Sequence, residues 1–515
     1  VNPSKDTFLC VLKVCARLGS LEKAHNIHDS ILRNGFELDP RIRSSLVYLY
    51  AKCHSLVDAQ KVFDGLNGDD VAAWNALIGG YAQHGHLNVA LEFYQKSVHV
   101  GIVPNKVTFL YIIKVCSLIG AFPEGRIIHD HICQCGMEGD LKLGSSLVDF
   151  YAKCGSLSEA SHVFDHLPRK NVVSWDAIIS GYAQHGQASH AFEAFHEMQK
   201  NGVKPIKMTF LALLKACDSV RTTVHGRRVH DQIVKHDLIF DVEIGNTLVH
   251  MYSKWGSLKE ACGVFNSLVM RTVVSWSSLI DGFVRQGQPH SALRHFMQMQ
   301  EEGVVPDEAT FSSALRACKS AEFVDQGKLL HDKIIRRDFD IGFILGTTIV
   351  DMYAKIGYLS EARCVLDNMP TRNVVSWGAM ISGYTTHGFP DLAIETFLEM
   401  QHQGLKSDKS TFVCTLKSCT TLGGVHTGML LHHNLMVESL ESDVLLGTSL
   451  IDMYAKSGCL AEARRVFDTS VNRDIITWGT LIGGYTHCEE HSLALDCLNE
   501  MQMQGMRPVD AIYTS

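Results

Sequence analysis

The chain has 515 residues, 46% of them hydrophobic and 20% charged, a balance that is typical of folded proteins and excludes intrinsic disorder. No apolar run reaches the roughly 18 residues that a membrane-spanning helix needs, and a single core is not expected because cores stop growing at about 250–300 residues. The net charge of −8 counts on average against binding of nucleic acid, although the charge of the binding face decides this in an elongated protein.

One feature organises the whole chain: it repeats itself every 101 residues, five times, without insertion or deletion. Four residue types keep this spacing, namely Trp74, Trp175, Trp276, Trp377 and Trp478; Cys15, Cys116, Cys217, Cys318 and Cys419; His28, His129, His230, His331 and His432; and Tyr50, Tyr151, Tyr252, Tyr353 and Tyr454. A fixed long period indicates a solenoid, in which each repeat packs only on its neighbours.

Each period divides into a long repeat of 35 residues, a short repeat of 31 and a standard repeat of 35. In the first period these are 5–39, 40–70 and 71–105. The later periods are expected at 106–206, 207–307, 308–408 and 409–509, with 510–515 opening a truncated next repeat. Because the chain also begins with Val1 rather than Met, we interpret it as a piece of a longer polypeptide and draw nothing from the missing targeting signal.

Every repeat shows two apolar-periodic helices. In the first standard repeat, Trp74, Leu77, Ile78 and Tyr81 lie on one face of a helix over 73–83, and Gly85 follows as its cap. A second helix follows before Gly101 and Pro104, and the short repeats read in the same way. We therefore predict an all-α solenoid superhelix of about fifteen helical hairpins.

The sixteen cysteines and 27 histidines predict neither disulfides nor a metal site. The periodic cysteines fall in apolar stretches, and the periodic histidines are expected to pack between helices. No CxxC pair exists, and Cys133-Gln134-Cys135 is poorly spaced for one tetrahedral metal. We expect no cofactor and no catalytic constellation, hence no enzyme.

The segments VVSWDAIISGYAQHG (172–186) and IVDMYAKIGYLSEAR (349–363) carry a family resemblance, as do NVVSWGAMISGY, TFLALLKAC and GTSLIDMYAKSG, which recur in order. Over 5–509 the chain resembles the pentatricopeptide repeat family, in the plant subclass whose long, short and standard repeats alternate. A tetratricopeptide array of 34-residue repeats fits the alternating 35 and 31 residues badly. The resemblance implies an organellar protein, in mitochondrion or chloroplast, that binds single-stranded RNA in a sequence-specific way.

In that family the fifth and last residues of a repeat together read one base, through small hydroxyl, amide and carboxylate groups. Carried onto this chain, guanine is implied by Ser44 with Asp70, Ser277 with Asp307 and Thr448 with Asp474. Adenine is implied by Ser145 with Asn171 and Thr347 with Asn373, cytosine by Asn75 with Asn105, and a pyrimidine by Asn246 with Thr272.

Other repeats depart from the pattern. Asp176 with Ile206 and Gly479 with Val509 match no reading, and Gly378 with Asp408 lacks one partner. The long repeats carry Leu9, Leu110, Leu211, Ser312 and Val413 at the fifth place and are expected to act as spacers. The implied target is N-G-C-N-A-N-N-Y-G-N-A-N-N-G-N, 5′ to 3′. The alternative is that the last residues are only helix caps, where Asp, Asn, Ser and Thr are favoured in any case.

Two sets of basic residues also follow the period. The short repeats carry Lys52, Lys153, Lys254, Lys355 and Lys456, and the long repeats carry Lys13, Lys114, Lys215, Arg316 and Lys417. Stacked, they would line the base-reading row and contact RNA phosphates. Placement at helix C-termini, where a cation complements the helix dipole, is the alternative, and we expect it for the long-repeat set and not for the short-repeat set.

The periodic tryptophans could stack on bases, but each neighbours the fifth residue, about 100° around the helix, and we expect them in the core. Val173, Val274, Val375 and Ile476 could wedge between bases.

The predicted function is selection of one organellar transcript site for C-to-U editing. The zinc deaminase that the family appends is recognised by an HxE followed by a CxxC, which this chain lacks, so a deaminase domain or editing cofactor protein would act in trans or beyond residue 515. RNA stabilisation or splicing, and a helical scaffold that binds protein, remain the alternatives.

Overall fold

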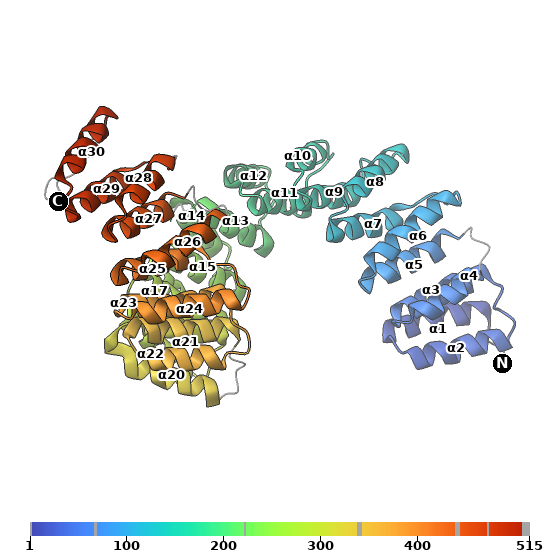
Figure 1. The fold of residues 1–515 in the computed structure, drawn as a ribbon. Coiled ribbons are helices and arrows are strands. Elements are labelled where there is room, and N and C mark those ends of the chain that lie inside the picture. Colours follow the sequence, from blue (N-terminus) through green and yellow to red (C-terminus); the bar gives the residue numbers. More distant parts are fainter. Residues whose placement is uncertain are drawn as a thin grey trace. The chain divides into compact units, whose positions relative to one another are not determined.

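The computed structural model describes residues 3–65, 70–220, 223–336, 342–437, 443–470 and 473–506. In this part of the chain the regular elements are thirty α-helices and one short 3₁₀ helix, and no strand occurs, so the predicted all-α class is confirmed. The helices form two compact units, residues 1–251 and 252–515, called here the N-terminal and C-terminal units (Figure 1).

The N-terminal unit contains the helices α1 (Lys5–Leu18), α2 (Leu21–Arg33), α3 (Pro40–Lys52), α4 (Leu56–Asp64), α5 (Val71–Gln83), α6 (Leu87–His99), α7 (Lys106–Ile119), α8 (Phe122–Gln134), α9 (Leu141–Lys153), α10 (Leu157–Asp165), α11 (Val172–Gln184), α12 (Ala188–Lys200), α13 (Lys207–Val220), α14 (Thr223–Lys235) and most of α15 (Val242–Lys254).

The C-terminal unit contains α16 (Leu258–Ser267), α17 (Val273–Arg285), α18 (Pro289–Glu301), α19 (Glu308–Ala317), η1 (Ala321–Phe323), α20 (Val324–Arg336), α21 (Phe343–Ile356), α22 (Leu359–Asn368), α23 (Val374–Thr386), α24 (Pro390–His402), α25 (Lys409–Leu422), α26 (Val425–Val437), α27 (Val444–Lys456), α28 (Leu460–Thr469), α29 (Ile475–His487) and α30 (His491–Met503).

The first helix of every hairpin starts where the sequence places a repeat boundary. Helices begin at residues 5, 40 and 71 and at the equivalent positions of the four later periods, each directly after the last residue of the preceding repeat. Most of these last residues are Asp or Asn, whose side-chain oxygen accepts the otherwise unpaired N–H groups of the new helix. We propose the 35-31-35 division as the structural repeat on this basis.

Within each unit the first helices pack on one another in series. In the N-terminal unit the contacts run from α1 through α3, α5, α7, α9 and α11 to α13, and in the C-terminal unit from α17 through the odd-numbered helices to α29. Within a unit each second helix packs on the first helix of its own hairpin, as in α3 with α4 or α27 with α28. The first helices therefore form a continuous layer within a unit, which is the arrangement of an α-solenoid.

The residues of the 101-residue register fill the core, as predicted. Trp175, Trp276, Trp377 and Trp478 are at most 1% exposed, and Trp74 is 6% exposed. Trp74, Trp175, Trp276 and Trp478 pack edge-on against a phenylalanine of the preceding short repeat, as Trp74 does against Phe63 at 4.6 Å between ring centroids. The tryptophans thus pack between repeats, and their burial leaves no ring face exposed for stacking on a base.

The periodic cysteines and histidines are structural as well. The five cysteines of the register are all buried, and burial raises the pKa of the Cys116 thiol to about 12, so it stays protonated. Nδ1 of His129 lies 2.9 Å from the Tyr151 hydroxyl, and the same contact recurs at His28, His331 and His432. The histidines therefore join a long repeat to the next short repeat, as expected.

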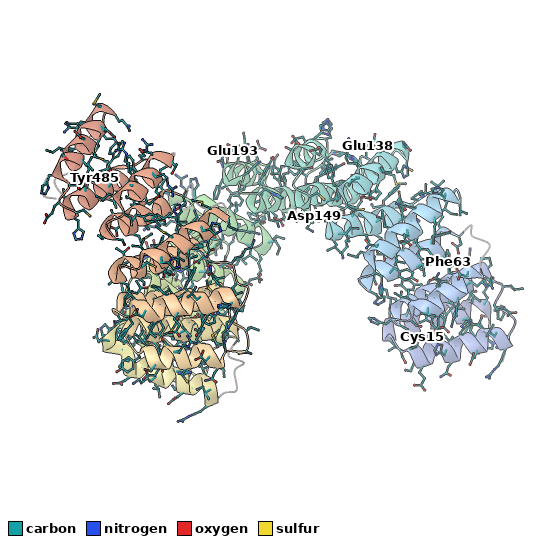
Figure 2. The ribbon with its side chains drawn as sticks, viewed as in Figure 1. Cys15, Phe63, Glu138, Asp149, Glu193 and Tyr485 are labelled. Atoms are coloured by element: carbon teal, nitrogen blue, oxygen red, sulfur yellow. The ribbon has the colours of Figure 1, made fainter. Side chains whose placement is uncertain are left out.

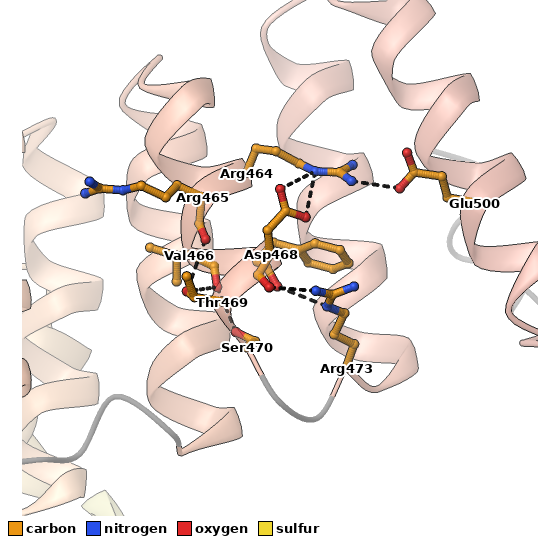
Figure 3. A network of polar contacts seen from close by, with 9 residues as sticks. Arg464, Arg465, Val466, Asp468, Thr469, Ser470, Arg473 and Glu500 are labelled. Carbon is orange, nitrogen blue, oxygen red and sulfur yellow. Dashed lines mark hydrogen bonds and ion pairs between the residues drawn. The ribbon is translucent and has the colours of Figure 1, made fainter.

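On the side of the second helices, an arginine joins neighbouring hairpins (Figure 3). Arg464 on α28 donates through Nε to both carboxylate oxygens of Asp468, at 3.0 and 3.1 Å, and through Nη2 to Glu500 on α30, at 2.8 Å. Arg363 makes the same contacts with Asp367 and Glu399 one period earlier. These arginines tie a short repeat to the following standard repeat away from the layer of first helices.

None of the helices in the described ranges is both long enough and apolar enough to span a bilayer.

Candidate nucleic-acid interface

The layer of first helices is hollowed in the N-terminal unit. A cavity of about 610 Å³ lies over α1, α3, α5 and α7, and it is lined by two predicted base-reading pairs, Ser44 with Asp70 and Asn75 with Asn105. Lys13 and Lys52, one from each predicted basic set, line the same cavity. The structure therefore brings together residues that the sequence assigned separately to bases and to phosphates.

A second hollow of about 500 Å³ continues along α7 and α9. It shares Val107 and Tyr111 with the first cavity, so the two hollows are neighbours. Lys114 and Lys153, the next members of the two basic sets, line it together with Asp149. Basic residues of both sets thus line the groove in the first period and in the second.

The fifth and last residues of a repeat touch each other where both carry polar side chains in this groove. The Ser44 hydroxyl donates a hydrogen bond to Oδ2 of Asp70. Nδ2 of Asn75 donates to Oδ1 of Asn105 at 3.1 Å. In these two repeats the pair forms one polar surface, as base reading by two side chains requires.

The last residues also cap the next helix, as the capping alternative expected. Oδ1 of Asn171 accepts the N–H of Ser174 at 2.9 Å, and Oδ1 of Asn373 accepts that of Ser376 at 2.9 Å. Asp307, Asp408 and Asp474 accept in the same way through Oδ1. Because the cap occupies Oδ1, an asparagine is left with its Nδ2 donor and an aspartate with its Oδ2 acceptor.

The remaining predicted readers keep their positions but make fewer mutual contacts. Ser145 donates to the Leu141 carbonyl at 2.6 Å, Ser277 to Val274 at 3.2 Å and Thr448 to Val444 at 2.7 Å. The buried hydroxyl oxygen of Thr347 has no hydrogen-bond partner within the described ranges. Gly378, with no side chain, leaves Asp408 alone at its repeat.

One predicted pair, Asn246 with Thr272, and the final repeat cannot be described as pairs. Asn246 lies on α15 in the N-terminal unit, whereas Thr272 caps α17 in the C-terminal unit, accepting the N–H of Ser275 at 3.4 Å. Val509, the expected last residue of the final repeat, and residues 510–515 lie outside the described residues.

A ring of hydroxyls next to the readers was missed by the sequence reasoning. The third residue of the repeat that follows a reader is Ser or Thr at eight junctions, and each of these side chains is at most 3% exposed: Thr108, Ser174, Thr209, Ser275, Thr310, Ser376, Thr411 and Thr477. Thr477 donates to Oδ1 of Asp474 at 2.7 Å, and this hydrogen bond is the main cause that lowers the pKa of the Asp474 carboxyl. These hydroxyl residues recur at 101 residues, and this spacing could have identified them from the sequence.

The short-repeat lysines are partly neutralised by their own helices. Lys153, Lys355 and Lys456 form ion pairs with Asp149, Asp351 and Asp452, one turn earlier, at 2.7 to 3.1 Å. Figure 2 labels Asp149 on α9. Lys52 instead donates to Oε1 of Gln83 at 2.7 Å. All four pairings are on the surface, where phosphate can compete with them.

The helix-dipole interpretation was assigned to the wrong basic set. Lys52, Lys153, Lys254 and Lys456 are the last residues of their helices, and Lys355 is the last but one. Lys13 and Lys114 lie in mid-helix, five residues before the ends of α1 and α7. The dipole therefore explains the position of the short-repeat set, whereas of the long-repeat set Arg316 alone lies in the last turn of its helix, α19.

The small apolar residues at the second place of the standard repeats are exposed. Val173, Val274, Val375 and Ile476 expose 56 to 69% of their surface, although each lies in the first turn of a helix. Side chains of this kind next to the fifth residue could pack on the faces of bases.

No group of three or more His, Cys, Asp or Glu side chains that could hold a metal occurs among the residues that the structure describes.

Comparison with protein families gives matches along the chain. The PPR repeat model matches residues 6–36, 145–172, 246–273, 347–374, 448–475 and 476–506, and the PPR repeat family model matches 69–117, 170–218, 271–320 and 372–421. Together these segments include most of the chain, and the starts at 69, 170, 271 and 372 and at 145, 246, 347 and 448 follow the 101-residue period.

Curated relatives from Arabidopsis thaliana match over nearly the whole chain. Pentatricopeptide repeat-containing protein At1g11290, chloroplastic, is 32% identical over 95% of this chain and 61% of its own length. Pentatricopeptide repeat-containing protein At5g27110 is 31% identical over 97% of this chain and 73% of its own length. At3g02330, mitochondrial, is 28% identical over 99% of this chain and 58% of its own length. The chain therefore spans about three fifths of the first of these relatives.

Solved structures share the fold. The crystal structure of pentatricopeptide repeat protein PPR10 from maize superposes with a TM-score of 0.63 at 21% identity, covering 100% of this chain and 76% of that one. PPR10 in complex with an 18-nt psaJ RNA element superposes with a TM-score of 0.65 at 20% identity, with the same coverage.

Proposed function

Because the chain belongs to the pentatricopeptide repeat family, we propose that it binds single-stranded RNA along the groove of its first helices, one base to a repeat. PPR10, which shares the fold, was solved with an RNA element. The observation that carries the proposal is the contact between Asn75 and Asn105, fifth and last residues of one repeat, inside a cavity that Lys13 and Lys52 also line.

The caps supply a physical reason for the assignment of bases. With Oδ1 held by the helix, Asp307 and Asp474 present an acceptor, which suits the N1–H and N2–H donors of guanine. Asn171 and Asn373, held in the same way, present the Nδ2 donor, which suits the N1 acceptor of adenine. Asparagine and aspartate at one position thus differ as the two purines differ at N1, which is an acceptor in adenine and a donor in guanine.

The basic sets support the same proposal. A chain of net charge −8 keeps a lysine or arginine at two fixed places in each period, and in the N-terminal unit both places border the groove. Contacts with phosphates there would release counterions, so the affinity would fall as salt rises.

The biological role that we propose is to select an organellar transcript site for C-to-U editing, within the subclass of alternating long, short and standard repeats. The organellar location agrees with the relatives, which are named chloroplastic or mitochondrial. The deaminase would come from a further part of the polypeptide or from another protein. RNA stabilisation or splicing would use the same groove.

A protein-binding scaffold is the contrasting function. It is favoured by the repeats whose fifth and last residues do not form a reader, such as Asp176 with Ile206. In a scaffold the groove would hold a peptide, and exchange of bases in an added RNA would change nothing.

Equilibrium binding to the implied 15-nucleotide RNA tests the proposal. The control is the same RNA with its G and A positions exchanged, and both are titrated with salt. We expect a preference of roughly tenfold or more for the implied RNA, since a mismatched base costs about 1–3 kcal/mol in nucleic-acid recognition. Equal or undetectable binding of the two RNAs would leave the fold intact and favour the scaffold.

A further inference from the structure

The buried hydroxyls beside the readers form a relay at two junctions. At the first, the backbone N–H of Asn105 donates to Oγ1 of Thr108 at 3.1 Å, and Oγ1 donates to Oδ1 of Asn75 at 2.6 Å. At the second, the N–H of Ile206 donates to Oγ1 of Thr209 at 3.0 Å, and Oγ1 donates to Oδ1 of Asp176. In each case the hydroxyl comes from the repeat after the one that carries the fifth residue, and the threonine is at most 3% exposed.

We infer that Thr108 is a positioning residue, which determines the atoms that Asn75, the fifth residue of the preceding repeat, presents to a base. Thr209 holds Asp176 through the same contacts, in a repeat whose fifth and last residues match no base. A hydroxyl has one hydrogen to donate. The Thr108 hydroxyl has two acceptors within reach, Oδ1 of Asn75 at 2.6 Å and Oδ1 of Asn105 at 3.2 Å. Since the shorter contact is the stronger one, that hydrogen is directed to the oxygen of the fifth residue. This inference rests on the proposed function and deepens it.

At the first junction the relay fixes an amide that could otherwise turn over. Oδ1 of Asn75 faces the Thr108 hydroxyl, so its Nδ2 faces Asn105. Oδ1 of Asn105 accepts from Val107 N–H, Thr108 N–H and Nδ2 of Asn75, so Nδ2 is the part of the Asn105 amide that is left for a base. The repeat consequently offers N–H donors, which suit the N3 and O2 acceptors of cytosine, whereas uracil carries a donor at N3.

Other junctions show what the hydroxyl does when the fifth residue of the preceding repeat offers it no amide or carboxylate. Opposite Gly378, Thr411 donates to Oδ1 of Asp408 at 2.5 Å and positions no reader. At the Asn-capped short repeats, Ser174 and Ser376 donate to the cap carbonyls at 2.9 and 2.8 Å. Thr411 at the Gly378 junction is therefore a matched control, because it is as buried as Thr108 and also contacts the cap side chain.

The test compares Thr108→Val, Thr108→Ser and Thr411→Val in the whole chain, with RNAs that carry C or U at the third nucleotide. We expect Thr108→Val to reduce the C-over-U preference about threefold to tenfold, the range for one lost hydrogen bond. Thr108→Ser should keep the preference, and Thr411→Val should leave it unchanged. If Thr108→Val lowers overall affinity or stability as Thr411→Val does and keeps the wild-type C-over-U ratio, the hydroxyl is only structural and the inference is wrong.

A second measurement needs no RNA, so it distinguishes a failure of the proposed function from a failure of this inference. Absence of any C-over-U preference in the wild type would contradict the base reading itself. The relay is then tested in the free protein by following the Asp176 carboxyl with ¹³C-labelled aspartate. Thr209→Val should raise its pKa further, because the donated hydrogen bond favours the charged form. An unchanged titration would overturn the relay.

Discussion

Nζ of Lys153 lies 2.7 Å from Oδ2 of Asp149, one turn earlier on α9, so a lysine that borders the proposed RNA groove is paired with an acid of its own helix. Both side chains are a little over 40% exposed, and such a pair contributes only about 0.2–1 kcal/mol. Phosphate oxygens can therefore take the place of the carboxylate, and the aspartate weakens RNA binding by competing for the lysine.

Removal of this acid should tighten RNA binding. Asp149→Asn is expected to increase affinity about twofold to fivefold at moderate salt, because the competing carboxylate is lost while Lys153 stays. The measurement is a salt titration of RNA affinity. Glu193→Gln is the charge-matched control, since Glu193 is exposed on α12, a second helix (Figure 2). Lys153→Ala should reduce the slope of log affinity against log salt by about 0.7. Equal effects of Asp149→Asn and Glu193→Gln would indicate a general charge effect and no phosphate contact at Lys153.

Exchange of a single cap should switch one base. In Asn171→Asp the cap oxygen still accepts the Ser174 N–H, but the outward donor becomes an acceptor. The preference at the fifth nucleotide should change from adenine to guanine, measured as the ratio of affinities for two RNAs that differ only there.

The new negative charge will weaken both complexes, so the ratio is the informative quantity. Asn201→Asp introduces the same charge at the end of α12, where Asn201 bonds the Glu197 carbonyl, and should leave the ratio unchanged. A fifth-nucleotide ratio in Asn171→Asp that equals that of the wild type would refute the assigned register.

The sequence predicted the fold in unusual detail because every period repeats the same packing problem. Trp276 and Cys318 are buried for the reason that Trp175 and Cys217 are, and the apolar spacing fixed which helix face they occupy. Helix starts coincide with the expected repeat boundaries because the last residue is in most repeats an Asp, Asn, Thr or Ser that caps.

The contacts between repeats could not be predicted in the same way. The hydrogen bond from Thr108 to Asn75 joins residues 33 apart, and the dipole role of Lys153 requires the helix to end at that residue. Periodicity gives the face of a helix on which a side chain lies, but not which of two neighbours it meets. For the same reason the helix-dipole interpretation was given to Lys13, which lies in mid-helix.

Asp176 should make the protein less stable as the pH rises. Burial raises the pKa of its carboxyl to about 6, and the Thr209 hydroxyl opposes this only in part. The folded state therefore holds a proton that the unfolded state releases near its ordinary pKa of about 3.9, so stability is lost as the pH rises through about 6. Asp176→Asn should be more stable than the wild type by ~1 kcal/mol at pH 7.5, after discounting for partial exposure, with no difference near pH 4.

Chemical unfolding of the two proteins at several pH values measures this difference. Asp474→Asn should change the stability with the opposite sign, because the Thr477 hydroxyl and N–H lower the pKa of the Asp474 carboxyl. The stabilising effect of the Asp474 carboxylate is present above the pKa of the unfolded state and is lost in acid. If Asp176→Asn gives the same gain at pH 4 and pH 7.5, a cause other than the carboxyl charge is responsible.

The contact between α8 and α9 predicts a coupled pair of substitutions. A Cβ placed on Gly125 would overlap the ring of Phe150, which is rigid, most closely at Cζ. Gly125→Ala should therefore destabilise the N-terminal unit by about 1–3 kcal/mol through overpacking, despite the better helix propensity of alanine. In the equivalent places of the first period stand Ala24 and Leu49, both 0% exposed. An alanine thus fits where the facing residue is a leucine.

Phe150→Leu should accordingly rescue Gly125→Ala. Alone, Phe150→Leu leaves a cavity and costs about 1–2 kcal/mol, but the methyl group that Gly125→Ala adds fills part of it, so the double variant should be more stable than either single one. Gly428→Ala, which faces the flexible thioether of Met453, should cost less than Gly125→Ala. The free energies come from urea unfolding of the wild type and of these variants. If the two single free-energy changes simply add in the double variant, helices α8 and α9 have moved apart, because a shared cavity couples the two sites only while the helices keep their distance.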